Sequence, residues 1–162
     1  MAYITAEEYE KWYGAADISA FDRLAFEASR ILDRMTTGVD GVKKLKNHFP
    51  AEPEDAEAVK ICAAQIVNFL AGVEAVEATA VQGQGYDQTA QGLRGKVISS
   101  VSAGNESISY AASGAAGTAF NAAAADISAR GKMTREIARE GLQGVCDANG
   151  VNLLYMGPYP RG

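Results

Sequence analysis

Histidine and cysteine, on which much enzyme and metal chemistry depends, are scarce in this chain of 162 residues. His48 is the only histidine, and Cys62 and Cys146 lie far apart, without the spacing of a metal-binding pair. A zinc site needs several such ligands, and a Ser-His-Asp or Cys-His arrangement would have to use His48. The sequence therefore predicts no enzyme, no metal and no cofactor, and two buried thiols typical of a reducing compartment.

Positive charge is also in deficit. Fifteen Lys and Arg stand against 20 Asp and Glu, a formal net charge of −5. A nucleic-acid backbone attracts an excess of Lys and Arg, so this composition excludes a compact basic nucleic-acid binder. One basic cluster, Lys43, Lys44 and Lys46, lies beside His48. The sequence favours a solvated connector with a solvated or capping histidine; the alternative is contact between the lysines and a phosphate or an acidic partner.

Long apolar runs are missing as well. Hydrophobic residues make up 48% of the chain, but much of this is alanine, which favours thin helices in close contact. No apolar run approaches the ~18 residues of a membrane-spanning helix, and the polar N-terminus lacks the pattern of a signal peptide. The glycines of Gly83-Gln84-Gly85 match no phosphate-binding or dinucleotide-binding loop. One globular domain without a membrane partner is the expected result.

Signals for helix starts and stops are clear in the first third. Thr5 and Glu8 form a capping box for a helix that should end at Gly14. A second helix is expected to start at Ser19 and to stop at residues 36–38. Its apolar residues recur at steps of three and four, so it should bury one stripe.

The centre of the chain predicts the spine of the fold. A connector over residues 38–53 contains one possible helical turn near residues 42–45. Pro53 and the acids after it then start a long helix over residues 54–80. At 1.5 Å per residue, this helix is roughly 40 Å long.

The second half is less regular. A Gly/Gln-rich loop is expected over residues 82–95, followed by a serine-alternating β-hairpin over residues 97–110. The alanine-rich segment 111–130 should add helix in its second half. A last helix is predicted from about Thr134 to Cys146, and the residues after 150 should be extended by their prolines.

A plain helical domain needs neither the predicted hairpin nor the apolar C-terminal tail. A lone hairpin is marginal in water and should lean on a helix or on a partner. The C-terminal tail is apolar and aromatic, which typically marks a docking surface, although it could instead pack back onto its own helices. The candidate docking residues of the tail are Leu153, Leu154, Tyr155, Met156 and Tyr159.

The order of these elements is similar to a known family. The helix over residues 21–36, the long helix over 54–80, the serine hairpin over 98–110 and the ending Leu-Leu-Tyr-Met-Gly at 153–157 occur in one succession. In this order the chain resembles, over nearly its whole length, the head–tail connector (adaptor) proteins of tailed bacteriophages. The hairpin and the ending are the most specific parts of the resemblance, and neither is catalytic.

The resemblance implies a mainly α fold: a helical bundle with one long central helix, a small β-hairpin and an extended C-terminal tail. It implies a helical adaptor domain over residues 1–150 and a docking tail over 151–162. Copies would form a homo-oligomeric ring, expected as a dodecamer, in the virion neck, assembled in the bacterial host cytoplasm. The ring would join the portal protein to the tail or the next neck protein and let DNA pass without sequence-specific binding. The tail residues named above would dock on the portal, and the hairpin would contribute ring or neck contacts through Val97, Ile98, Val101, Ile108 and Tyr110.

The net negative charge of the chain suits a conduit for DNA, because a lumen rich in carboxylates repels passing DNA. This predicts that some of Glu54, Glu57, Glu74 and Glu77 face the lumen. The alternative function is a transient DNA-packaging (terminase-associated) or regulatory binding protein, which the lysine-bearing connector and the long helix would also suit.

Overall fold

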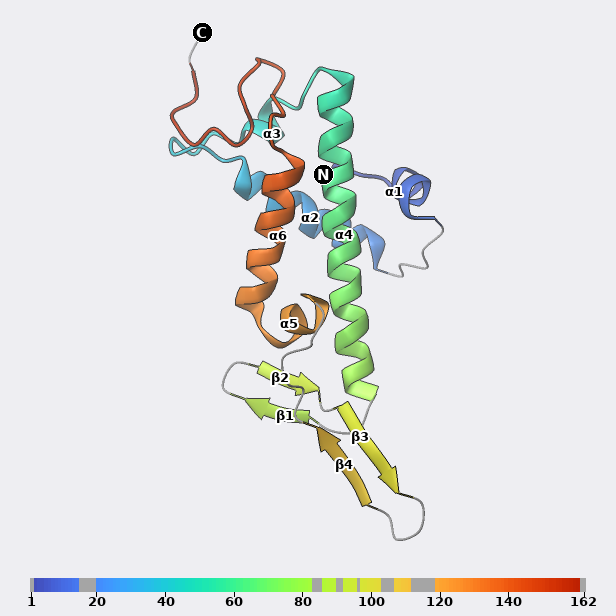
Figure 1. Ribbon diagram of the computed structural model, residues 1–162. Coiled ribbons are helices and arrows are strands. Elements are labelled where there is room, and N and C mark those ends of the chain that lie inside the picture. The colour runs from blue at the N-terminus through green and yellow to red at the C-terminus, as the bar shows by residue number, and fades with distance from the viewer. Residues whose placement is uncertain are drawn as a thin grey trace. The chain divides into compact units, whose positions relative to one another are not determined.

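A helix of 30 residues, α4 (Pro53–Gln82), is the longest element of the computed structural model (Figure 1). The chain is mainly helical, as the sequence predicts. It divides into two compact units: unit 1 comprises Met1–Ala71 and Thr134–Gly162, and unit 2 comprises Gly72–Met133. The structure describes residues 2–14, 20–82, 86–89, 92–95, 97–102, 107–111 and 119–160, and between residues 79 and 111 it describes the backbone alone.

The first helix, α1 (Ala6–Tyr13), has the predicted boundaries for the predicted reasons. The Thr5 hydroxyl accepts the Glu8 N–H at 3.3 Å, and the Glu8 carboxylate accepts the Thr5 N–H at 3.0 Å. This reciprocal capping box satisfies two N–H groups that the first turn leaves unpaired. The helix ends at Gly14, whose φ of +75° is accessible to glycine at little cost.

Helix α2 (Phe21–Met35) presents one buried stripe, as its periodicity predicts. Leu24, Ala25, Ala28 and Leu32 are buried, and the helix stops at Thr36. The connector after it contains one helical turn, α3 (Lys44–Asn47), which starts two residues later than the predicted turn.

Helix α4 begins at Pro53, as the sequence predicts, with Glu54 and Asp55 in the first turn, where carboxylates meet the positive end of the helix dipole. The stretch Pro53–Ala78 has the length and composition to cross a membrane, and half of an apolar 18-residue part of it is buried inside the chain. The expectation that no segment reaches this length is therefore wrong. Core helices of globular proteins have the same properties.

The alanine-rich segment and the last helix differ in part from their predictions. Helix α5 (Ala119–Ala125) confirms that the second half of the alanine-rich segment is helical. Helix α6 (Ile127–Gly141) begins seven residues before the predicted Thr134 and ends five before Cys146. Its early start has a local cause: the Asp126 carboxylate accepts the Ser128 N–H at 2.8 Å and caps the first turn.

Four strands have a described backbone. Strands β1 (Tyr86–Thr89) and β2 (Gly92–Gly95) pair antiparallel, within the segment that the sequence predicts as a loop. Strands β3 (Val97–Ser102) and β4 (Ser107–Ala111) also pair antiparallel, with a register shift between Ile98 and Ser100. The side chains of the predicted hairpin contacts lie outside the described part of the chain. These residues are Val97, Ile98, Val101, Ile108 and Tyr110.

The two cysteines lie in different surroundings. Cys62 of α4 is buried against Gly141 of α6, where an added Cβ would lie 2.7 Å from the Cys62 sulfur. Burial raises the pKa of the Cys62 thiol to about 12. Cys146 is half-buried, so the prediction of two buried thiols is confirmed for Cys62 and wrong for Cys146; both thiols are free.

We therefore expect a thiol-alkylating reagent at mildly alkaline pH to modify Cys146 and to spare Cys62. A pKa about three units above its usual value leaves Cys62 about 10³-fold less of the reactive thiolate, before burial slows access further. Peptide mass spectrometry over a time course measures both rates. In concentrated guanidinium chloride the two rates should converge; equal rates in the folded protein would contradict the packing of Cys62.

Candidate docking surface at the C-terminal segment

The C-terminal segment, residues 145–160, is held by a network of hydrogen bonds centred on the buried Asp147. One carboxylate oxygen of Asp147 accepts the backbone N–H groups of Asn149 and Val151, both at 2.9 Å. The other accepts the Tyr159 hydroxyl at 2.6 Å. Burial and the bond to Asp147 raise the pKa of the Tyr159 hydroxyl. Asp147 thus fixes both a tight turn and the far end of the segment.

Lys44 anchors the middle of the segment from α3. Its side chain is 1% exposed, and its ammonium donates to the backbone carbonyls of Asn152, at 3.3 Å, and Tyr155. The same ammonium lies 5.7 Å from the centre of the Tyr155 ring. Burial lowers the Lys44 pKa, opposed by the charges of Asp147 and Asp40. The prediction of a solvated lysine cluster is therefore wrong for Lys44, while Lys43 and Lys46 are exposed.

His48 also belongs to this anchor. Its backbone carbonyl accepts the Ala148 N–H at 3.2 Å. Its ring stacks on the Tyr159 ring, with centres 5.0 Å apart, and its Nδ1 lies 3.3 Å from the Asn149 side-chain nitrogen. The half-buried His48 therefore positions the C-terminal segment, a role that neither sequence interpretation named.

The five candidate docking residues divide by burial. Leu153 is fully buried in unit 1, and Leu154 and Tyr159 are half-buried. Tyr155 and Met156 are 47% and 54% exposed. Leu153 is therefore a core residue of its own chain, because the hydrogen bond from its N–H to the Val145 carbonyl, 2.9 Å long, turns the segment inward there.

A third apolar residue joins Tyr155 and Met156 at the surface. Val39 is 73% exposed, and its N–H donates to the Met156 carbonyl at 3.3 Å. We call Val39, Tyr155 and Met156 the tail patch. Val39 was not among the predicted docking residues, although an apolar side chain between Gly38 and Asp40 in a polar turn was a usable signal.

Two glycines, Gly38 and Gly157, lie where the tail patch meets the connector. A Cβ on Gly157 would collide with the Tyr155 hydroxyl, and one on Gly38 would lie 3.2 Å from the Gly157 carbonyl oxygen. The two backbones approach closely because neither residue has a side chain. A side chain at Gly157, in the Leu-Leu-Tyr-Met-Gly ending, would displace the Tyr155 ring from its position in the tail patch.

The four glutamates predicted to face a lumen differ in their exposure. Among the lumen candidates, Glu54 and Glu57 are exposed and Glu74 is half-buried. Glu77 is ion-paired with Arg130, which neutralises part of its charge. Among the described residues, no group of three His, Cys, Asp or Glu side chains is placed to hold a metal ion.

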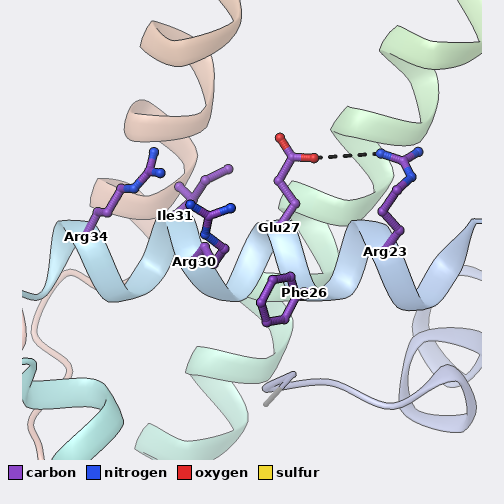
Figure 2. A pocket seen from close by; sticks show the side chains of 6 residues that line it. All are labelled: Arg23, Phe26, Glu27, Arg30, Ile31 and Arg34. Atoms are coloured by element: carbon purple, nitrogen blue, oxygen red, sulfur yellow. Dashed lines mark ion pairs between the residues drawn. The ribbon is translucent and has the colours of Figure 1, made fainter.

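A second surface lies on the outer side of α2. A shallow hollow of about 330 Å³ is lined by Arg23, Phe26, Glu27, Arg30, Ile31 and Arg34. Figure 2 shows the three arginines and Glu27 along one side of the helix, with Phe26 on another edge; Arg23 and Glu27 pair at 3.9 Å. The spacing of these arginines is visible in the sequence, on the side of the helix opposite the predicted buried stripe.

No protein-family model, no curated protein and no solved structure matches this chain.

Proposed function

We propose that the chain is a structural, non-enzymatic neck protein of a tailed bacteriophage. Copies form a ring that joins the portal vertex to the tail or to the next neck protein and lets DNA pass. The family resemblance of the sequence motivates this proposal. The anchored tail patch is the observation that best supports its docking part.

A docking surface should be apolar, exposed and already ordered, because ordering a flexible tail on binding costs affinity. The tail patch meets these conditions: Tyr155 and Met156 are about half exposed, while Lys44 and Asp147 hold the backbone beneath them. Tyrosine and methionine are enriched in protein interfaces. We therefore assign portal contact to Tyr155, Met156 and Val39, and a supporting role to Leu153.

The hairpin is proposed as a further contact. A two-stranded ribbon gains stability when another surface covers it. In a ring, the hairpin over residues 97–110 would find that surface on the neighbouring copy or on the next neck protein. The proposed ring is located in the virion neck and assembles in the host cytoplasm.

The first test is quantitative mass spectrometry of purified, DNA-filled particles from the producing host. A fixed ratio near that of the portal protein is expected for a neck component. Absence from finished particles, with presence in the assembling lysate, would overturn the proposal and favour the transient packaging factor. Burial of Lys44 already removes one of the lysines on which that alternative depended.

The second test removes the tail patch. We expect the double variant Tyr155→Ala, Met156→Ala to lower the amount of this protein in particles at least about tenfold, since the anchors of an interface dominate its binding energy. Its free energy of unfolding should change by no more than about 1 kcal/mol, because both side chains are half exposed. Ile127→Ala, at an apolar residue that is 82% exposed elsewhere, is the matched control. Normal incorporation of the double variant would remove the tail patch from the docking surface.

A further inference from the structure

The outer face of α2 is a ridge of positive charge with apolar edges. Arg23, Arg30 and Arg34 recur at steps of seven and four, so they lie on one side of the helix. Phe26 is 50% exposed beside them. Within the described part of the chain, no carboxylate lies within ion-pair distance of Arg30 or Arg34. The ridge therefore carries two available cations and an uncovered aromatic ring.

The first turns of α4 carry the opposite pattern. Glu54 and Glu57 are exposed, and no described cation lies within ion-pair distance of either. Ile61 is 36% exposed, and Gln65 is exposed one turn further on. These four residues also share one side of their helix. Both ridges belong to unit 1, and each spans eleven steps, about 16 Å at 1.5 Å per residue.

We infer that the arginine ridge of α2 on one copy packs antiparallel against the acidic ridge of α4 on a second copy. In this register Arg34 meets Glu54, Arg30 meets Glu57, Phe26 meets Ile61 and Arg23 meets Gln65. The steps are four, four and three residues along α2 and three, four and four along α4, so paired positions differ by at most one residue and the ends coincide. The arrangement also sets the negative end of the α2 dipole beside the positive end of α4.

The pairing deepens the proposed function and rests on it, because it names the subunit contact of the ring. The two ridges are different surfaces of one chain, so joining them between copies gives a head-to-tail contact, which closes into a ring when the rotation allows. Duplex DNA fits the arginine ridge less well. Glu27 interrupts the ridge, apolar residues flank it, and the chain carries a net charge of −5.

The test is a charge swap in the full-length protein. Variant A carries Arg30→Glu and Arg34→Glu, and variant B carries Glu54→Arg and Glu57→Arg. Sedimentation at low salt measures the self-association of the wild type, of each variant and of their mixture. Circular dichroism verifies that each variant keeps its helices; all four side chains are exposed.

We expect the wild type to form species larger than a dimer, and to dissociate as salt screens the contact. Variants A and B should each associate at least about tenfold more weakly, because like charges then face each other. An equimolar mixture should restore association, since A and B can alternate around a ring with opposite charges at every contact. Lys43→Glu with Lys46→Glu, on exposed lysines outside both ridges, is the matched control and should associate like the wild type.

The pairing would be overturned if the wild type stayed monomeric up to about 1 mM or formed nothing larger than a dimer. It would also be overturned if variants A and B associated like the wild type, or if their mixture did not restore association. A wild type that binds duplex DNA through the arginines, with unchanged self-association in variant A, would assign the ridge to DNA. If the chain is present in particles at the portal ratio while the charge swap fails, the pairing alone is wrong and the proposed function stands.

Discussion

Replacing Leu153 with alanine is expected to lower the free energy of unfolding of unit 1 by about 3–5 kcal/mol. Leu153 has no exposed surface, and truncating a fully buried leucine costs the lost transfer free energy together with the cavity that remains. The residue lies at the point where the C-terminal segment turns inward. The cavity would therefore loosen the backbone beneath the tail patch, and docking should weaken through a residue that touches no partner.

This effect can be measured by denaturant unfolding, followed by circular dichroism and by tryptophan fluorescence. Trp12, the only tryptophan, is in α1 of unit 1 and therefore reports on this unit. Leu154→Ala is the matched control: it removes the same atoms from a half-buried neighbour and should cost about 1 kcal/mol. A loss below about 1 kcal/mol for Leu153→Ala would mean that the segment is not packed as described.

The elements that the sequence predicted well are those set by neighbouring residues. The capping box of Thr5 and Glu8, the stop at Gly14 and the start at Pro53 each act within one turn of helix. Such signals can be read without knowing the rest of the fold. The same rule could have placed the start of α6 correctly, instead of seven residues too late in the chain. Asp126 is a favourable cap two residues before Ser128.

The direction of the C-terminal segment had no comparable signal. The hydrogen bonds that hold this segment join residues far apart in the sequence. The Lys44 ammonium donates to the Tyr155 carbonyl, 111 positions away, and the Tyr159 N–H donates to the Asp40 carboxylate, 119 positions away. Sequence alone suggested an apolar tail, but not that Leu153 would face inward while Met156 faces outward. That division depends on which backbone carbonyls Lys44 reaches, and only the assembled unit 1 determines this.

Replacing Lys44 with methionine is the second change with a large expected effect, about 2 kcal/mol of lost stability. Methionine fills a similar volume but cannot donate, so the carbonyls of Asn152 and Tyr155 lose charge-assisted hydrogen bonds. Relief of the cost of burying an ammonium offsets part of this loss. The bonds should outweigh the relief, because one ammonium bonds two backbone carbonyls, and methionine would leave both without this donor.

Denaturant unfolding and hydrogen exchange of the Val39 and Leu153 amides separate this local anchor from a general loss of stability. Both amides donate to carbonyls within or beside the segment that Lys44 holds, so their exchange should accelerate most. Lys46→Met, at an exposed lysine two positions away, should change stability by no more than about 0.5 kcal/mol. If Lys44→Met is as stable as the wild type, the free-energy cost of burying the ammonium equals the stabilisation that its hydrogen bonds contribute. The C-terminal segment would then be held mainly by Asp147, His48 and the packing of Leu153.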